Sequence, residues 1–322
     1  MRAFVTGAAG FVGSNLVDRL LADGHQVTGL DNLSTGRIQF LESALRSAAF
    51  DFHQGDISDA ELLCRLMAHA DCVFHMAANA DVRFGLKHPH LDVEQNTIGT
   101  FNVLEAMRIT RTRRLAFAST GSIYGEPAVF PTPETAPFPI QTSLYGASKL
   151  AAEGLIMAYS EGFDIQSYIF RFVSILGERY THGHVFDFYE QLCKHSGELH
   201  VLGDGTQRKS YLYVQDCIDG MLLALRQAHS RVNIFNLGTD DSCVVNDSIG
   251  WIIQHLGLSP KVTYGGGRRG WVGDSPFILL DCSKIRALGW KPLLTIREGV
   301  VRTLDYLQRS PEALTCQAQK PT

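Results

Sequence analysis

Tyr145 and Lys149 are the two residues of this chain whose types and spacing best suit proton transfer. They are four residues apart in a predicted helix over Ser143–Ser160, so the phenol and the ammonium share one helix face. A free tyrosine, with a pKa of about 10, is a poor base at neutral pH. We expect a nearby cation, either Lys149 or an oxidised nicotinamide, to stabilise the phenolate and lower the pKa of Tyr145.

Thr120 and Ser122, on either side of Gly121, place hydroxyl groups at the end of a strand predicted over Leu115–Ser119. A hydroxyl at such a strand end can bind a reacting oxygen and orient its proton. A tyrosine and a lysine at this spacing are common on exposed helices, so the pair alone is weak evidence. Its position after the fifth strand of a dinucleotide-binding pattern makes it specific.

The N-terminal residues have the spacing of a dinucleotide-binding turn. Gly7, Gly10 and Gly13 follow a predicted strand over Arg2–Thr6 and open a predicted helix over Phe11–Ala22. Gly7 permits a tight turn, Gly10 lets the backbone approach a pyrophosphate, and Gly13 allows close packing of helix on sheet. The free N–H groups at the start of the helix favour the anion.

Asp31 lies at the tip of the second predicted strand, Gln26–Leu30, where the ribose diol of a dinucleotide would lie. Neither position 31 nor position 32 is basic, which favours NAD over NADP. Two later segments fall in the order that the rest of this cofactor requires. Gly55–Ile57 is placed to hold the adenine edge, and His75–Ala78 has small residues that let the cofactor pass close to the backbone.

Short β-rich runs alternate with helical stretches up to about residue 170. This alternation predicts right-handed crossovers and an α/β fold with a doubly wound parallel sheet, whose ligands bind at the carboxyl ends of the strands. Besides the segments above, we predict strands over Phe50–Gln54, Cys72–His75 and Asp164–Arg171, and helices over Asp59–Ala68 and Asp92–Arg108.

The pattern loosens after Arg171. Glu126–Pro139 and Gly265–Pro276 are rich in proline or glycine and are predicted to be loops that shape a pocket. Asp216–Arg226 is predicted to be a helix and Asn233–Leu237 a strand that returns to the sheet. We therefore expect a cofactor domain over residues 1–172, rejoined at about 213–240, and a smaller α/β substrate domain mainly over 173–322, with the last dozen residues frayed.

The composition is that of an ordinary globular protein. Its 322 residues carry a net charge of −4, with 45% hydrophobic and 19% charged residues, so we expect neither nucleic acid nor a membrane as partner. The N-terminal residues are expected to form a strand rather than a signal peptide, which favours a cytoplasmic protein. Seven cysteines without a C-x-x-C pair favour reduced thiols. His182, His184 and Asp187 are read as a polar loop, and no metal site is expected.

The ordered motifs make the chain similar to the extended short-chain dehydrogenase/reductase superfamily, and within it to the nucleotide-sugar epimerases and dehydratases. The matching segments extend over about two-thirds of the chain. They are T-G-A-A-G-F-V-G at 6–13, D-N-L-S-T-G at 31–36, G-D-I at 55–57, H-M-A-A at 75–78, N-T-I-G-T-x-N-V-L-E-A at 96–106, S-T-G-S-I-Y-G at 119–125, Y-G-A-S-K at 145–149 and G-D-G-T-Q-R-K-S-Y-L-Y-V-Q-D at 203–216.

The resemblance implies a Rossmann fold, NAD as cofactor, and a catalytic triad of Thr120, Tyr145 and Lys149, in which Lys149 also holds the nicotinamide ribose. The residues expected to bind the cofactor are Gly7, Gly10, Phe11, Val12, Gly13, Asp31, Asn32, Ser34, Thr35, Gly36, Asp56, Ile57, Met76, Ala77, Ala78, Asn96, Tyr145, Lys149 and Phe172.

The resemblance also implies a shared first step, in which Tyr145 takes a proton from a sugar hydroxyl while hydride passes to NAD⁺. Dehydratases of this class carry Asp-Glu after the catalytic threonine, and UDP-glucuronate decarboxylases carry Glu at the second of these positions. This chain has Gly121 and Ser122 there. An epimerase needs no such acid, because it oxidises C4, turns the 4-keto sugar over and returns the hydride to the other face.

We therefore expect a UDP-sugar 4-epimerase that keeps its NAD. The alternatives are a dehydratase, decarboxylase or dehydrogenase of the same superfamily, or an NAD-binding regulator without catalysis. Intact Thr120, Tyr145 and Lys149 argue against the regulator.

The substrate is expected to contact both halves of the chain. Cations beside glycine-rich turns suit a diphosphate. The spacing back from Asp216 puts Lys209, not Arg208, at the family's usual arginine position, so the phosphate ligand is either Arg208 or Lys209. Ser174 and Arg83, within Val82–Phe84, resemble UDP-glucuronate 4-epimerases, while UDP-glucose stays open. The residues expected to bind the substrate are Arg83, Thr120, Gly121, Ser122, Ser174, Arg179, Arg208, Lys209, Arg269 and Asp274.

The family typically dimerises through the helices that correspond to Asp92–Arg108 and Ser143–Ser160. Both carry apolar stripes in this chain. We therefore expect a homodimer.

Overall fold

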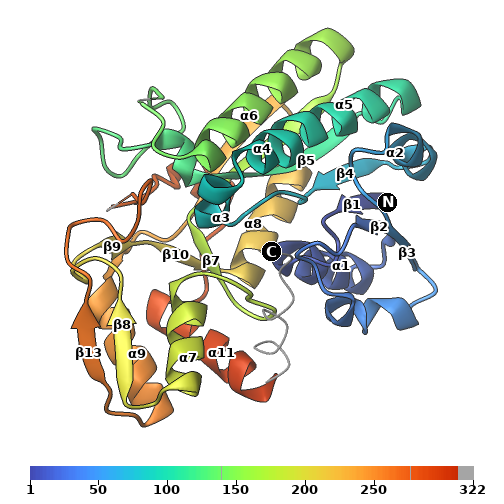
Figure 1. The fold of residues 1–322 in the computed structure, drawn as a ribbon. Helices are drawn as coiled ribbons and strands as arrows, with labels where there is room; N and C mark the ends of the chain where they lie inside the picture. Colours follow the sequence, from blue (N-terminus) through green and yellow to red (C-terminus); the bar gives the residue numbers. More distant parts are fainter. Residues whose placement is uncertain (139, 276, 311–322) are drawn as a thin grey trace.

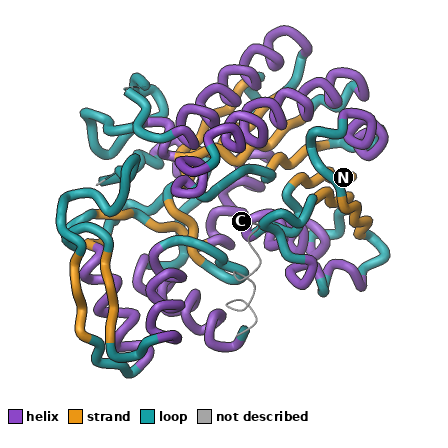
Figure 2. The backbone as a smooth tube through the Cα atoms, in the orientation of Figure 1, coloured by secondary structure: helices purple, strands orange, loops and turns teal. Residues whose placement is uncertain are grey.

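A seven-stranded parallel sheet forms the centre of the computed structural model, which describes residues 1–138, 140–275 and 277–310 (Figures 1 and 2). This confirms the predicted doubly wound fold. Along the sheet the strands follow the order β3, β2, β1, β4, β5, β6, β11, and every neighbouring pair is parallel. Their bounds are β1 (Arg2–Thr6), β2 (Gln26–Asp31), β3 (Phe50–Gln54), β4 (Cys72–His75), β5 (Arg114–Thr120), β6 (Gln166–Phe172) and β11 (Val232–Leu237).

Helices cover both faces of the sheet. Because neighbouring side chains of a strand point in opposite directions, each strand contributes to two separate cores. Phe4 and Val73 face the core under α2 (Ala60–Met67), α5 (Gly99–Thr110) and α6 (Leu144–Phe163). Val5 and Phe74 face the core under α1 (Phe11–Ala22) and α8 (Val214–Gln227). Figure 1 shows the two helical layers on either side of the strands. Each fully buried apolar side chain contributes about 1.5–3 kcal/mol.

The strand order reverses between β1 and β4. From β1 the chain moves outward to β2 and β3, whereas from β4 it moves the other way to β5 and β6. Segments that follow β1 and β4 therefore diverge and leave a crevice at the carboxyl ends of the strands. The glycine turn follows β1 at this point, and Met76–Ala78 follows β4.

The helix predicted over Asp92–Arg108 differs at its start. After α4 (Pro89–Leu91), residues Asp92–Ile98 form wider π-helical turns, η3, and the regular helix α5 begins only at Gly99. Within this segment, the side chain of Asn79 donates to Asp92 Oδ1 (3.0 Å) and its N–H donates to Asn96 Oδ1 (2.9 Å), so both polar residues of η3 face the loop after β4.

A second set of elements follows β6, and the sequence patterns missed most of it. Three short strand pairs form: β7 (Ser174–Leu176) with β10 (Tyr211–Tyr213), β8 (Glu198–Val201) with β13 (Lys261–Tyr264), and β9 (Arg208–Lys209) with β12 (Cys243–Val244). They pack with α7 (His184–Lys194), α9 (Val245–Leu256) and α11 (Ile296–Arg309) around a core of their own. This core supports a separate substrate domain, and the domain boundaries stay a prediction. The remaining elements are η1 (Ile38–Leu41), η2 (Ala44–Arg46), α3 (Val82–Lys87), η4 (Gly121–Tyr124) and α10 (Ser283–Arg286).

The predicted return of the chain to the sheet is confirmed, because β11 pairs with β6 along its whole length. The described parts of the two predicted loops, 126–138 and 265–275, contain no helix or long strand and appear as loop in Figure 2. The last dozen residues lie outside the described part of the chain.

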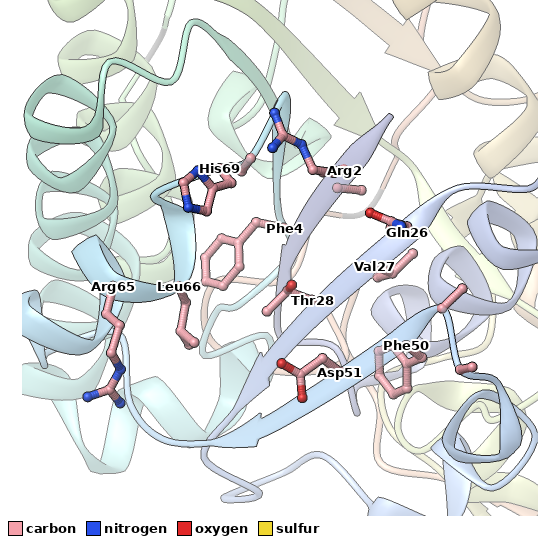
Figure 3. Close-up of a pocket in the computed structure, with 14 residues that line it drawn as sticks. Arg2, Phe4, Gln26, Val27, Thr28, Phe50, Asp51, Arg65, Leu66 and His69 are labelled. Carbon is pink, nitrogen blue, oxygen red and sulfur yellow. The ribbon is translucent and has the colours of Figure 1, made fainter.

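A pocket lies at the amino ends of β1, β2 and β3, at the sheet edge opposite the crevice (Figure 3). Arg2, Gln26 and Phe50, which begin the three strands, line it together with Arg65 on α2 and His69 just after that helix. None of the residues expected to bind cofactor or substrate lines this pocket.

Six cysteines lie in the described residues, and all are free thiols, as the sequence predicts. Within the same residues, no helix is long and apolar enough to cross a membrane. No group of three or more His, Cys, Asp or Glu side chains in the described ranges is arranged to hold a metal ion.

Candidate active site

The glycine turn is in direct contact with the loop that follows β4. Gly7 has a φ of +68°, and a Cβ atom on it would lie 2.7 Å from the backbone nitrogen of Ala77. A Cβ atom on Gly13 would lie 2.0 Å from the carbonyl oxygen of Gly7. Both positions therefore require glycine, and the first N–H groups of α1 face the crevice with Phe11 and Val12 half-buried beside them.

Asp31 is 8% exposed and ties the glycine turn to the loop after β2. Its Oδ2 accepts from the N–H of Ala9 (2.9 Å) and its Oδ1 from the N–H of Leu33 (2.8 Å). Burial raises the pKa of Asp31, and these two hydrogen bonds oppose the shift. A Cβ atom on Gly36 would lie 2.6 Å from Asp31 Oδ1, so the loop can close over the carboxylate only with glycine there.

The loop after β3 meets the loop after β2 through their side chains. Asn32 Nδ2 donates to Asp56 Oδ2 (2.6 Å), and the N–H of Ser58 donates to Asp56 Oδ1 (2.8 Å). Burial raises the pKa of Asp56, but these hydrogen bonds outweigh it and leave the pKa below its ordinary value. Ser34 and Thr35 are exposed on the same loop, and Ile57 is buried under Gly99.

The end of β4 is held by buried polar contacts. His75 Nδ1 lies 2.7 Å from Thr6 Oγ1, and His75 Nε2 lies 3.0 Å from Thr100 Oγ1. Burial, and then the charge of Lys149, lower the pKa of His75 to about 3, so this ring stays neutral. Asn96 Nδ2 donates to Ser148 Oγ (3.0 Å), which joins η3 to the helix that carries Lys149.

Tyr145 and Thr120 meet where α6 approaches the end of β5. Their side chains share a hydrogen bond, and Thr120 Oγ1 lies 3.2 Å from Ser122 Oγ. The approach depends on Gly146, because a Cβ atom there would lie 2.8 Å from the carbonyl oxygen of Ser122. The N-cap Ser143, whose Oγ accepts from the N–H of Gly146 (3.0 Å), fixes the start of the helix.

The expected lowering of the Tyr145 pKa is wrong for the protein alone. Burial raises the pKa of Tyr145 to about 12, the carboxylate of Asp92 adds to the rise, and the hydrogen bond from Thr120 only opposes it. The reason is physical: burial disfavours a phenolate at this position, and the charge of Lys149 does not offset that effect.

Lys149 is 1% exposed, and its Nζ lies 4.0 Å from the centre of the Phe117 ring. Burial lowers the pKa of Lys149 to about 7, and the carboxylate of Glu153, one helical turn further, opposes this shift. The site thus contains a lysine that loses its proton near neutral pH and a tyrosine whose pKa is raised.

On the substrate side, Lys209 and Asp274 form a close, half-buried ion pair. Lys209 Nζ lies 2.5 Å from Asp274 Oδ1 and donates to the carbonyl oxygen of Ser275 (2.6 Å). The ammonium also lies 5.6 Å from the centre of the Trp271 ring. Lys209 is therefore anchored, whereas Arg208 is exposed and lies over the ring of Phe277.

Arg83 lies against the same indole. Its guanidinium pairs with Asp187 (Nη1 to Oδ2, 2.9 Å) and lies 5.9 Å from the centre of the Trp271 ring. Arg269 forms an ion pair with Glu126, which joins the two loops 126–138 and 265–275. The side chain of Phe84 lies outside the described residues.

Two expected substrate residues lie apart from this group. Arg179, with a φ of +67°, pairs with Asp18 on α1, two turns from the start of that helix. Ser174 is exposed at the start of β7. His184, which the sequence places in a polar loop, is half-buried and forms hydrogen bonds with Tyr211 and Ser248.

Several residues of the site were missed from the sequence. Trp271 and Asp187 join the substrate side, and Glu153 and Arg171 form a fully buried ion pair behind the catalytic helix. A signal existed for Glu153, which continues the i, i+4 series of Tyr145 and Lys149 on a largely apolar helix. A charged residue such as Arg171 in a buried strand also implies a partner, but the sequence does not say which.

Comparisons with known proteins agree with this geometry. The NAD dependent epimerase/dehydratase family matches residues 3–238. A UDP-glucose 4-epimerase of Mycolicibacterium smegmatis is 33% identical over 318 residues, which cover 97% of this chain and 100% of that protein. A crystal structure of UDP-galactose 4-epimerase is 35% identical with a TM-score of 0.86, covering 96% and 99% of the two chains. The structure of UDP-glucuronic acid 4-epimerase from Bacillus cereus with UDP-glucuronic acid and NAD is 28% identical with a TM-score of 0.89, again covering 96% and 99%.

The crevice fits NAD. The glycine turn leaves no room for a Cβ atom at Gly7 or Gly13, and Asp31 presents a buried carboxylate at the tip of β2. With the cofactor of the family, Gly10 and the start of α1 would hold the pyrophosphate, and Asp31 a ribose diol.

Replacement of Gly13 by alanine should abolish NAD binding and destabilise the fold, because the new Cβ would lie 2.0 Å from the Gly7 carbonyl oxygen. Gly154→Ala is the matched control, since this exposed glycine of α6 has nothing within 4 Å of its Cβ position. We expect it to stabilise the protein by up to about 1 kcal/mol. Calorimetric NAD titration and thermal unfolding of both variants measure the effects, and normal NAD binding by Gly13→Ala would contradict the assigned turn.

Lys149 should make the stability of the cofactor-free protein depend on pH. Its pKa of about 7 in the folded state lies below the ordinary value of 10.5. Between these two values the unfolded chain binds the extra proton, so the free energy of unfolding should rise as pH increases from 7 to 10. Urea unfolding of the wild type and of Lys149→Met across this range isolates the contribution. A difference between the two proteins that does not vary with pH would count against the buried ammonium.

Proposed function

The chain belongs to the NAD-dependent epimerase/dehydratase family, and we propose that it interconverts UDP-glucose and UDP-galactose by inverting C4. NAD is the cofactor of the family. The observation that carries the proposal is the turn after β5. It presents Thr120 and Ser122, hydrogen-bonded to each other, beside Tyr145, and it has Gly121 and Ser122 where an eliminating or decarboxylating enzyme needs an acid.

When bound, NAD supplies reversible hydride acceptance at C4 of the sugar. The protein's own residues manage the proton. Tyr145 is placed to take it from the 4-hydroxyl and to return it after the sugar has turned over. Thr120 holds the phenol oxygen through its hydrogen bond. Lys149 lies one helical turn further along α6, and its charge does not lower the pKa of Tyr145 in the protein alone.

The choice of a neutral hexose rests on Arg83. A substrate carboxylate needs an available cation, but the guanidinium of Arg83 is already neutralised by Asp187 at 2.9 Å. Arg179 pairs with Asp18 on α1. The relative named UDP-glucose 4-epimerase is also matched along its whole length.

UDP-glucuronate is the second candidate. Ser174 favours it as a small hydroxyl residue, and the UDP-glucuronic acid 4-epimerase from Bacillus cereus has the same fold with a TM-score of 0.89. For this substrate, Arg83 would have to exchange Asp187 for the sugar carboxylate.

We also propose that two copies of the chain associate through η3, α5 and α6. Val93, Ile98, Phe101 and Ile109 leave between 39 and 58% of their surface exposed along one segment. The ring of Phe101 contacts Tyr159, which contacts Phe163, so the apolar surface continues onto α6. Contiguous exposed apolar surface of this kind suits a self-complementary interface.

The proposed activity is tested by incubating the purified protein, loaded with NAD, with UDP-galactose and following C4 inversion by NMR. We expect kcat/KM for UDP-galactose to exceed that for UDP-galacturonate at least about tenfold, because Arg83 and Arg179 are already paired with Asp187 and Asp18. A reversed preference would favour the second candidate. Net release of NADH, or elimination of water, would contradict epimerisation.

Tyr145→Phe identifies the proton carrier in the same assay. It should lower kcat by about 10²–10⁴-fold and leave NAD binding intact, because it removes only the phenolic hydroxyl. Thr120→Ser should keep most of the activity, whereas Thr120→Val, which loses the hydrogen bond to Tyr145, should not. Full activity of Tyr145→Phe would refute its assignment as the base.

Phe101→Glu should convert the dimer into a monomer, because it places a charge in the middle of the proposed interface. Leu293→Glu is the control, since this exposed leucine lies outside η3, α5 and α6 and should leave the dimer unchanged. Light scattering coupled to size-exclusion chromatography measures both. A monomeric wild type, or a dimeric Phe101→Glu protein, would exclude this interface.

A further inference from the structure

Glu153 and Arg171 form a salt bridge that is sealed inside the protein. Glu153 on α6 is fully buried and Arg171 near the end of β6 is 1% exposed. Arg171 Nη2 lies 2.7 Å from Glu153 Oε2, and its Nε lies 3.1 Å from Oε1, so the guanidinium grips both carboxylate oxygens. Burial of two charges is costly, and apolar replacements of such pairs are often as stable or more stable. A gain in folding stability alone therefore does not explain the presence of the Glu153–Arg171 ion pair at this position.

The carboxylate end of the pair reaches the strand that carries Thr120. Ser119, the residue before Thr120 in β5, donates its hydroxyl to Glu153 Oε1. Glu153 lies one helical turn after Lys149 on α6. The same carboxylate thus links the helix of Tyr145 and Lys149 to the strand end that presents Thr120.

The guanidinium end reaches the other side of the same turn. Arg171 Nη1 donates to Tyr124 Oη (2.7 Å) and to the carbonyl oxygen of Glu134 (3.0 Å). Tyr124 is the last residue of η4, and its hydroxyl donates in turn to Asn236 Oδ1 on β11 (2.9 Å). The segment Gly121–Ser122 is therefore held at both ends, at Ser119 by Glu153 and at Tyr124 by Arg171.

We propose that Glu153 and Arg171 are positioning residues, which hold the turn of Thr120 and Ser122 against Tyr145 and set the electrostatic field at Lys149. The proposal rests on the proposed function, because it concerns the same proton-transfer site. Neither side chain contacts the reacting atoms, and each acts through Ser119, Tyr124 or Lys149.

Four groups determine the field at Lys149 and Tyr145. Among the described residues, the carboxylate of Glu153 on α6 raises the pKa of Lys149 and so opposes the effect of burial. His75 on β4 faces it as a neutral ring, because burial lowers the pKa of His75 to about 3. Asp92 on η3 acts on Tyr145 and adds to the rise in its pKa. Arg171 offsets part of the charge of Glu153.

Removal of single hydroxyl groups tests the positioning role without breaking the ion pair. In Ser119→Ala and Tyr124→Phe, the turn of Thr120 loses one of its two anchors. We expect kcat for UDP-galactose to fall at least about tenfold, with KM changed less than about twofold, because the geometry of the reacting groups rather than binding is affected.

Tyr168→Phe is the matched control for Tyr124→Phe. Tyr168 is buried on β6 like Arg171, and its hydroxyl donates to the carbonyl oxygen of Ala228 (2.9 Å), away from the turn. It removes the same kind of buried hydrogen bond and should keep the wild-type kcat. Equal kcat values in Ser119→Ala, Tyr124→Phe and this control would overturn the positioning role.

The electrostatic effect of Glu153 and Arg171 on Lys149 can be measured without any substrate. The chain has eight lysines, so NMR of protein labelled with ¹³C at lysine Cε resolves the titration of Lys149, assigned with Lys149→Met. In the double variant Glu153→Gln with Arg171→Gln, which leaves neither member of the ion pair as an unpaired charge, we expect the midpoint of Lys149 to fall by about one pH unit or more. In Glu153→Asp, which keeps the charge, it should stay within about half a unit of the wild type.

A midpoint of Lys149 unchanged in the double variant would overturn the electrostatic role. Failure of the proposed function is separately visible, because the wild type would then not epimerise UDP-galactose while its lysine titration could still be measured.

Discussion

The buried charge pair of Glu153 and Arg171 constrains the arrangement of everything around the active site. Two ions removed from water are tolerated only where nearly every donor and acceptor is satisfied. Here α6, β5, β6, η4 and β11 each contribute to that satisfaction through the pair, Ser119, Tyr124 and Asn236. A shift of any one of these elements would leave a charge or a hydroxyl without its partner. The requirement to satisfy the buried pair therefore fixes the position of the strand end that carries Thr120.

Desolvation acts on the two ionisable groups of the site in opposite directions and to the same end. It raises the pKa of Tyr145 to about 12 and lowers that of Lys149 to about 7. Both shifts favour the uncharged forms, so Tyr145 and Lys149 carry less charge near neutral pH than an exposed tyrosine and lysine would. Any cation or developing negative charge that enters therefore acts in a medium of low polarity, where electrostatic interactions are stronger than in water.

The sequence predicted the sheet and the glycine turn after β1 well because their signals are local. Gly7, Gly10 and Gly13 lie within one turn, and the acid at Asp31 follows at the next strand end. The second half was poorly predicted because its strands pair across long separations, as in β8 with β13. Nothing in the local pattern indicates the π-helical turns of η3, and the place of Arg179 depends on Asp18, which is distant in the sequence. The direction of the Tyr145 pKa depends on desolvation by the surrounding fold, which the spacing of Tyr145 and Lys149 does not encode.

The pairing of β11 with β6 has a consequence for synthesis of the chain. The edge of β6 has its partner only when Val232–Leu237 has been made, after all of residues 173–231. Until then the strand that carries Arg171 is an open edge, to which another chain could add. The last strand of the sheet can therefore pair only after residues 232–237 have been synthesised. A chaperone would have its longest opportunity to act before that pairing.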